Sequence, residues 1–160
     1  MALSCWGVAC KRLRRQGHAA IEVALMAPWI FLLFMGIFDF GFYSYAMISV
    51  ANAARVGALY TSGDPAIASD SAKACEYAVQ ELRMLPNVGQ LACSCSGSSC
   101  TAGPIAVQAR LLSGVSGVPF GADGTPATEV AVTYQSPQLF PLPGMMGRMT
   151  ITRVVQMKVI

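Results

Sequence analysis

The sequence predicts an α+β fold, in which a long N-terminal transmembrane helix precedes a small domain stapled by disulfides. Three observations support this: a nearly uncharged apolar stretch near the N-terminus, four cysteines in the C-terminal part, and a change from helical to alternating periodicity beyond Pro86. Its 160 residues fit one modest domain plus an appendage. We expect a removable basic leader over residues 1–17, a long helix over 18–60 and an α+β domain over 61–160.

The apolar stretch predicts a membrane span. Sixteen uncharged residues separate Glu22 from Asp39, and fifteen more separate Asp39 from Arg55. A bilayer core needs ~20 mostly apolar residues, so the stretch can cross if Asp39 lies at or beyond an interface. Basic residues before it hold the N-terminus in the cytoplasm, which places the following chain on the outer side. They are Lys11, Arg12, Arg14 and Arg15.

The net charge of +3 also comes from this basic leader. Without residues 1–17 the chain has seven basic against eight acidic residues. Nucleic-acid binding needs clustered positive charge, so this balance argues against a nucleic-acid partner. The leader is too short and too basic to build structure and resembles a targeting segment.

One continuous helix is predicted from His18 to about Tyr60, ending at a polar Thr-Ser-Gly sequence. Its 43 residues would extend ~64 Å, about twice the ~30 Å hydrocarbon core, so the second half must leave the membrane. Pro28 is expected to kink it. Gly36 and Gly41 are either packing notches or glycines tolerated in a membrane helix. Polar residues mark the second, more hydrated half of this helix: Asp39, Asn52 and Arg55. Small residues in the same half suit close helix packing: Ala51, Ala53, Ala54 and Ala58.

A second, amphipathic helix is predicted over roughly residues 65–85. Asp64 would be its N-cap, with Pro65 at the first helical position, and Pro86 would end it. Apolar residues recur on one face at a spacing of three to four. They are Ile67, Ala72, Cys75, Val79 and Leu82.

Alternating residues beyond this helix predict an antiparallel sheet of three or four strands. The signal is short around residues 90–95, clearer over 129–135, and present again over 149–159. Residues 105–112 fit either a short helix or a strand, and the rest of 96–128 is left open. The loop that follows has an apolar tip, which either forms a contact patch for a partner or membrane, or covers the open face of the sheet. Its apolar residues are Leu139, Phe140, Leu142, Met145 and Met146.

Four cysteines lie in the outward part, where an oxidising compartment favours two disulfides. They are Cys75, Cys93, Cys95 and Cys100. A bridge between Cys93 and Cys95 is disfavoured, because residues two apart on a strand hold their side chains parallel. The favoured pattern joins Cys95 to Cys100 across a turn and Cys75 to Cys93 between helix and strand.

No enzyme activity, cofactor or metal site is predicted. The outward part contains no histidine, since the single one is His18 at the start of the span. This removes Ser/His and Cys/His nucleophiles and most catalytic metal sites. The six carboxylates show no paired motif, and the oxidising compartment argues against a thiolate zinc site.

Gly17 and Glu22 remain as the candidate functional pair. An ionisable side chain within an apolar span is costly unless neutralised, and it marks a functional site by default. The span holds no lysine or arginine to pair with Glu22. Cutting after Gly17 would create a free α-amino group on His18, four residues before the acid.

The basic cluster, Gly17 and Glu22 resemble a type IV prepilin processing site. The wider string is similar to TadE-like minor pilins of tight-adherence (Flp/Tad) pili. The positions that carry this similarity are Gly17, Glu22, Ala24, Pro28, Gly36, Asp39, Gly41, Asn52, Ala53, Ala54, Arg55 and Gly57.

The resemblance implies a minor pilin or pseudopilin, held in the bacterial inner membrane with its domain in the periplasm. It would be cut by a prepilin peptidase between Gly17 and His18, and Glu22 would neutralise the His18 amine of a neighbour. Other major and minor pilins, the inner-membrane assembly platform and membrane lipid would be its partners.

Two alternatives belong to other classes. In one, a signal peptidase cuts before Ala54 and releases a soluble binding module, although the apolar region is longer than the 7–15 residues of a signal peptide. In the other, the chain stays anchored and uses Cys93 and Cys95 as an enzyme or thiol oxidoreductase, although it lacks a CxxC motif. The N-terminus of the mature protein distinguishes all three.

Overall fold

The fold is described for residues 6–114, 120–139 and 147–160 of a computed structural model, with side chains described from Ala19 onward. Two compact units, Met1–Phe42 and Tyr43–Ile160, divide the chain. The second unit contains one α+β domain, which confirms the predicted fold class. We call this second unit the domain.

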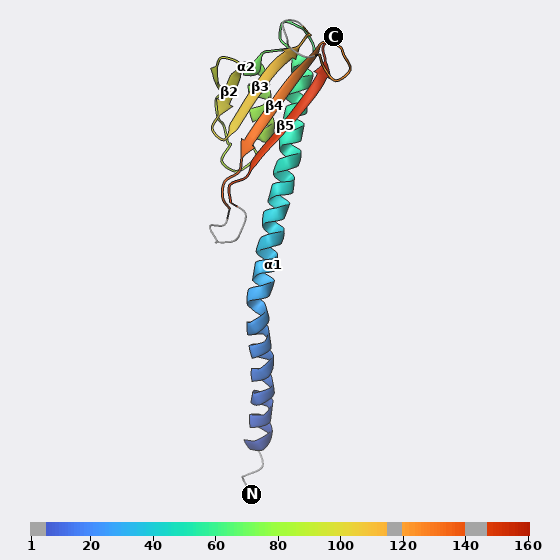
Figure 1. Ribbon diagram of the computed structural model, residues 1–160. Helices are drawn as coiled ribbons and strands as arrows, with labels where there is room; N and C mark the ends of the chain where they lie inside the picture. The colour runs from blue at the N-terminus through green and yellow to red at the C-terminus, as the bar shows by residue number, and fades with distance from the viewer. Residues whose placement is uncertain (1–5, 115–119, 140–146) are drawn as a thin grey trace. The chain divides into compact units, whose positions relative to one another are not determined.

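Helix α1 comprises Trp6–Thr61 and so contributes to both units (Figure 1). It ends where predicted but begins earlier than His18, because the leader is rich in alanine, leucine, lysine and arginine and contains no proline. The expectation that the leader builds no structure is therefore wrong. The helix continues through Pro28.

Helix α2 comprises Ser71–Leu82 and begins later than predicted. Its N-cap is Asp70, whose carboxylate accepts hydrogen bonds from the backbone N–H groups of Ala72 and Lys73 at 3.0 and 3.1 Å. Asp64 instead closes a separate turn, accepting from the N–H of Ala66 at 2.8 Å. The chain thus uses two aspartate caps in succession, and only the second starts a helix.

Five strands form one antiparallel sheet in the order β1-β2-β3-β4-β5, rather than the three or four predicted. Their bounds are Ser94–Ser96, Ser99–Ala102, Ile105–Leu112, Ala127–Gln135 and Thr150–Lys158. The extra strands come from the region left open, where residues 105–112 prove to be a strand. Since each strand pairs with the next in sequence, the sheet is a simple meander.

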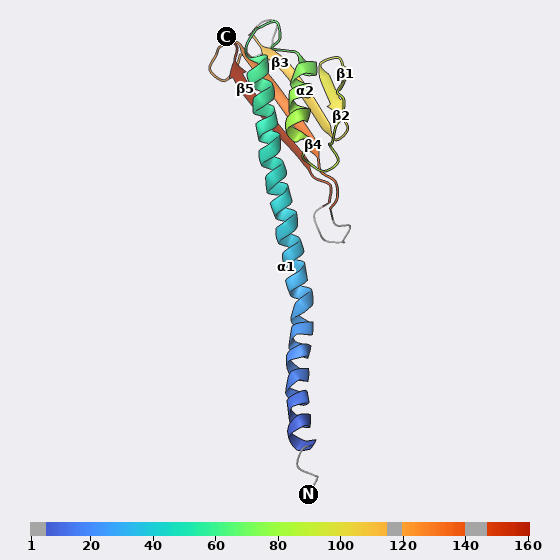
Figure 2. The ribbon, with the colours of Figure 1, turned by 180° about the vertical axis from the view of Figure 1, so that it is seen from behind.

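The two helices cover the same face of the sheet (Figure 2). Within the domain, α1 contributes a row of small residues to the core. Each member of this row is fully buried: Ala46, Val50, Ala53, Ala54 and Ala58. Of the alanines assigned to packing with other helices, Ala53, Ala54 and Ala58 therefore pack inside their own domain. Ala51 is half-buried.

A buried chain of hydrogen bonds fixes the end of α1 to the sheet. The hydroxyl groups of Thr61 and Thr128 lie 2.9 Å apart, and Thr128 donates to the carbonyl of Ala68 at 2.8 Å. Because both threonines are fully buried, these bonds satisfy groups that would otherwise lose their hydration. The end of α1, the connection to α2 and strand β4 thereby share one anchor.

Candidate functional site

The candidate site is the first half of α1, where large apolar side chains face outward. From Ile21 to Phe40, thirteen large hydrophobic residues are exposed, and Ile37 reaches 70% exposure. Over the described residues, Ala19–Thr61 is long and apolar enough to cross a membrane, and an 18-residue stretch within it has a mean hydropathy of 2.1. An exposed apolar surface of this extent requires a cover of lipid or protein.

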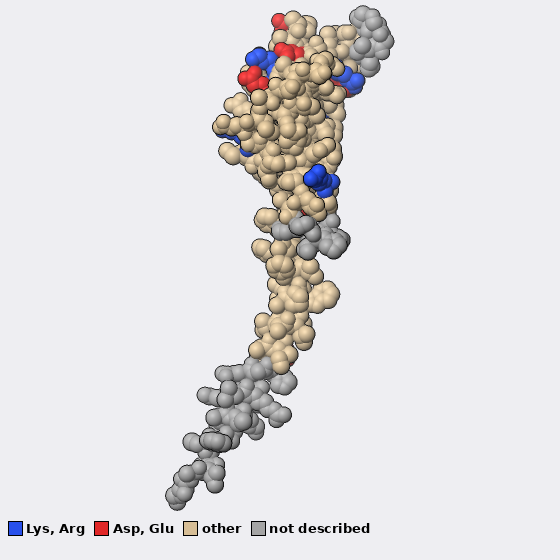
Figure 3. Space-filling model, turned by 90° about the vertical axis from the view of Figure 1, so that its left-hand side faces the viewer, with Lys and Arg blue, Asp and Glu red and all other residues tan. Residues whose placement is uncertain are grey.

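Charge is concentrated away from this segment. On the face shown in Figure 3, most of the visible charged side chains lie over the α+β domain. Within the described part of the segment, only Glu22 and Asp39 are ionisable acids, and no basic residue occurs before Arg55. Glu22 is exposed and forms no ion pair among the described side chains, whereas Asp39 is half-buried.

Gly17 and His18 lie within the helical part of the chain, before the first described side chain. Along the backbone of α1, residue 22 lies one helical turn after residue 18. The amine that would pair with Glu22 exists only after cleavage.

An apolar groove of about 510 Å³ lies around Gly36. Its walls are Trp29, Leu32, Leu33, Ile37 and Phe40. A Cβ added at Gly36 or at Gly41 would meet nothing within 4 Å, so neither glycine is used inside the chain. Asn52 and Arg55, the other predicted packing positions, are exposed on the part of α1 that belongs to the domain.

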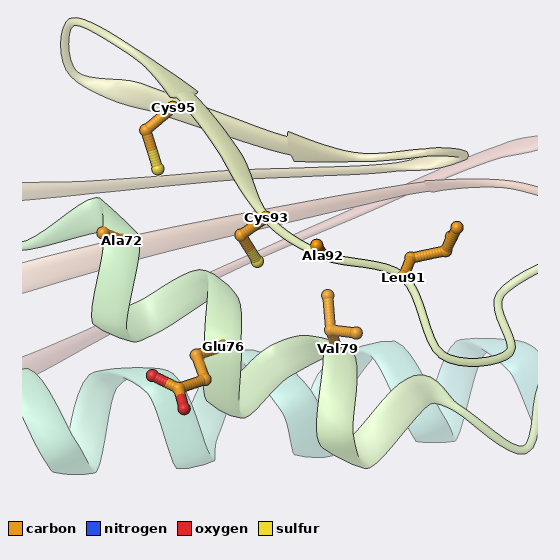
Figure 4. Close-up of a pocket in the computed structure, with 7 residues that line it drawn as sticks. All are labelled: Ala72, Glu76, Val79, Leu91, Ala92, Cys93 and Cys95. Atoms are coloured by element: carbon orange, nitrogen blue, oxygen red, sulfur yellow. The ribbon is translucent and has the colours of Figure 1, made fainter.

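The two disulfides join Cys75 to Cys93 and Cys95 to Cys100, which is the favoured pairing. The first ties α2 to the segment leading into β1, and the second links paired residues of the β1–β2 hairpin. Beside them lies a hollow of about 350 Å³ (Figure 4). Cys93 and Cys95 line one side of it, and Glu76 and Val79 of α2 line the other. Each cysteine of the Cys-x-Cys pair is held by a different partner.

No cluster of three or more histidine, cysteine, aspartate or glutamate side chains suited to a metal occurs within the described ranges. The apolar loop residues Phe140, Leu142, Met145 and Met146 lie outside those ranges, so their role stays a prediction. Sequence reasoning missed the polar hollow at the end of β4, described below, because its lining comes from four separate segments.

Tyr134 joins the end of β4 to the turn that follows α2. Its ring is fully buried, and its hydroxyl lies 3.1 Å from two acceptors, the Pro86 carbonyl and Asn87 Oδ1. Burial raises the pKa of Tyr134 from 10.0 to about 12. The hydroxyl therefore stays protonated in the folded protein at a pH at which an exposed tyrosine would ionise.

We expect Tyr134→Phe to destabilise the domain by about 1 kcal/mol, the usual net value of a buried hydrogen bond. Because the folded pKa is raised, the contribution of Tyr134 is fully present below pH 10 and declines as the pH rises through about 12. Thermal unfolding of both proteins in detergent between pH 8 and pH 12 measures this. A stability difference that stays constant across that range would contradict it.

In a comparison with protein families, residues 17–59 match the model described as TadE-like protein. No curated protein and no solved structure matches the chain. The matched segment contains Gly17 and Glu22, the whole exposed apolar run, and the part of α1 that packs into the domain. Over residues 17–59 the chain is therefore TadE-like, which confirms the resemblance recognised in its residues.

Proposed function

We propose that this protein is a membrane-anchored minor pilin or pseudopilin that takes part in building a tight-adherence pilus. One observation carries the proposal: the TadE-like match coincides with a helix whose first half exposes its apolar side chains. Such a helix suits both lipid and neighbouring helices, since transmembrane helices associate by close packing. The groove around Gly36 offers a place for such packing.

In this proposal the basic leader is removed by a prepilin peptidase after Gly17. The mature chain then begins at His18 and carries Glu22 as its fifth residue. Glu22 has no basic side chain on its own span, so the nearest available cation is a terminal amine. Pairing Glu22 with the His18 amine of a neighbour sets the axial step between packed helices.

The topology follows from the charge pattern. The four cations before Gly17 remain in the cytoplasm, and the disulfide-bonded domain lies in the periplasm, where disulfides persist. Before assembly the protein is a single-pass component of the bacterial inner membrane. Its partners are the prepilin peptidase, major and minor pilins, and the inner-membrane assembly platform.

Mass spectrometry of the mature N-terminus tests the proposal. A chain purified from membranes is expected to begin at His18, and a Gly17→Ala variant is expected to retain the leader or to be cut far more slowly. An intact Met1 would contradict processing and favour an uncleaved anchor. A chain that begins at Ala54 would favour a secreted binding module.

The structure offers an argument against that secreted module. Val50 and Ala53 are fully buried in the domain, and Ala46 one turn earlier is buried with them. A cut before Ala54 would remove residues 43–53, the first part of α1 within the domain, and would expose the core residues that they cover. The disulfides likewise disfavour a dithiol enzyme, because Cys93 and Cys95 are not bonded to each other.

A further inference from the structure

A polar hollow of about 420 Å³ opens at one end of the domain. Its lining comes from four segments: the turn after α2, the β2–β3 turn, the end of β4 with the residues that follow it, and Arg148 shortly before β5. The polar groups among them are Asn87, Gln135, Ser136, Gln138 and Arg148. A hollow with one cation and several amide and hydroxyl groups suits a small anionic ligand that also offers hydrogen-bonding oxygen atoms.

The position of this hollow follows from how α1 and β4 run along each other. At one end Thr61 contacts Thr128, and four residues earlier Gly57 lies against Val130. Strand β4 therefore runs back toward the start of the domain. From Val130 to Gln135 it advances roughly 17 Å. That is about eleven residues of helix, which brings Gln135 level with about residue 46 of α1.

The domain begins at Tyr43, only one helical turn before that level. The exposed apolar run ends at Phe40, and residues 19–42 extend about 36 Å as a helix, slightly more than the ~30 Å hydrocarbon core. If the segment spans the membrane, Tyr43 emerges among the headgroups. Because the chain passes directly from the membrane segment into the domain at Tyr43, the end of the domain near residue 46, where the hollow opens, is then next to the membrane surface.

Arg148 supplies the charge at this end. It is exposed, and it forms no ion pair with any described acid. Arg110, by contrast, is held by Glu129, with Nε donating to Oε1 at 2.6 Å. A guanidinium without a carboxylate partner is suited to bind phosphate oxygens in a bidentate manner.

The rim of the hollow is fixed rather than loose. The N–H of Ser136 donates to the carbonyl of Met149 at 2.9 Å, and the N–H of Met149 donates to Ser136 Oγ at 3.0 Å. Asn87 Nδ2 lies 3.4 Å from the Gln135 carbonyl, and Tyr134 holds Asn87 from below. These bonds fix the backbone on both sides of the opening, and Arg148 directly precedes the bonded Met149 in the chain.

We propose that this hollow binds the phosphate of an anionic phospholipid headgroup, with Arg148 as the principal ligand. The binding would fix the membrane-facing end of the domain on the outer surface of the bilayer in which α1 is anchored. This inference rests on the membrane insertion proposed above. It adds a ligand and a residue that the pilin assignment does not supply.

The test uses the full chain in lipid nanodiscs of equal parts phosphatidylglycerol and phosphatidylcholine. Native mass spectrometry after gentle release is expected to find phosphatidylglycerol enriched on the wild-type protein. Arg148→Gln is expected to reduce that enrichment about tenfold, as the loss of a charge-assisted hydrogen bond predicts. The matched control is Lys158→Gln, which removes the same charge from the far end of β5 and should leave the enrichment unchanged.

Three results would overturn the proposal. Equal enrichment in wild type and Arg148→Gln would remove the assigned ligand. An equal loss in Lys158→Gln would indicate general attraction to a negative surface. Loss of the phosphatidylglycerol enrichment in the mixed discs on addition of 10 mM inorganic phosphate would make the site one for free phosphate. Recovery of every variant in nanodiscs confirms membrane insertion separately, so failure of the lipid site and failure of the anchor give different results.

Discussion

A Glu22→Ala variant is expected to be inserted and processed normally but to support no pilus assembly. The carboxylate is exposed on the isolated chain and has no cationic side chain on its span. In a bundle of helices it would lie in a medium of low dielectric constant, where an unpaired amine on a neighbour costs several kcal/mol. Removing the acid leaves that amine without its partner in every copy.

Graded substitutions separate charge from shape at this position. Glu22→Gln keeps the size of the side chain but not its charge and should fail like alanine, whereas Glu22→Asp should retain part of the assembly. Glu81→Gln, an exposed acid on α2, is the matched control. Electron microscopy and immunoblotting of sheared surface fractions measure assembly, and N-terminal mass spectrometry of membranes verifies processing. Wild-type piliation in Glu22→Gln would refute the pairing role.

The elements that could be predicted from sequence are those set by local chemistry. Strand β5 alternates, and on β4 the predicted inward residues Val130, Val132 and Tyr134 are buried. At the start of β4, however, Thr128 and Glu129 on both faces are buried as well, which residue order alone does not reveal. The favoured disulfide pairing is also confirmed: excluding a Cys93–Cys95 bridge left two patterns, and the short turn between Cys95 and Cys100 favoured the observed one. The TadE-like segment was recognisable because its signal is an ordered set of small, acidic and apolar positions.

The elements that were missed depend on tertiary contacts. Strand β2 was missed, and β1 occupies only the end of the short strand predicted around residues 90–95. Both contain serine, cysteine and threonine, with low hydrophobic contrast, and the Cys95–Cys100 bridge holds their hairpin together. Helix α2 starts at Ser71 rather than near Pro65, and Ser71 Oγ accepts from the N–H of Ala109 on β3 at 2.9 Å. No pattern within residues 64–71 reveals that contact, so the sequence favoured Asp64 as the N-cap rather than Asp70.

The use of the alanines on α1 is a further case. Small residues on a predicted membrane helix suggest packing with another helix. Here Ala53, Ala54 and Ala58 allow α1 to lie close to its own sheet, as fully buried members of the core. Sequence alone does not reveal whether these alanines pack against another helix or against the chain's own sheet, because close approach to either requires small side chains.

Gly57 is the closest point of this contact, and Gly57→Leu is expected to destabilise the domain by about 3 kcal/mol or more. A Cβ built at Gly57 lies 3.3 Å from Val130 Cγ1, 3.7 Å from the Ala74 carbonyl oxygen and 3.9 Å from Ala74 Cβ. A leucine would therefore force α1 away from both β4 and α2. Gly57→Ala should change stability by less than about 1 kcal/mol, because its gain in helix propensity offsets the tight contact with Val130.

Gly36→Leu is the matched control, since the same substitution on the same helix meets nothing within 4 Å. Thermal unfolding of the full chain in detergent, followed by near-ultraviolet circular dichroism, reports on the domain through its tyrosines. We expect a lowered midpoint for Gly57→Leu alone. If Gly57→Leu unfolded at the wild-type temperature, α1 could not lie against Val130 as described. The buried end of the helix would then have to move independently of the sheet. The alignment of β4 with α1, from which we infer that the polar hollow lies beside the membrane, would lose its basis.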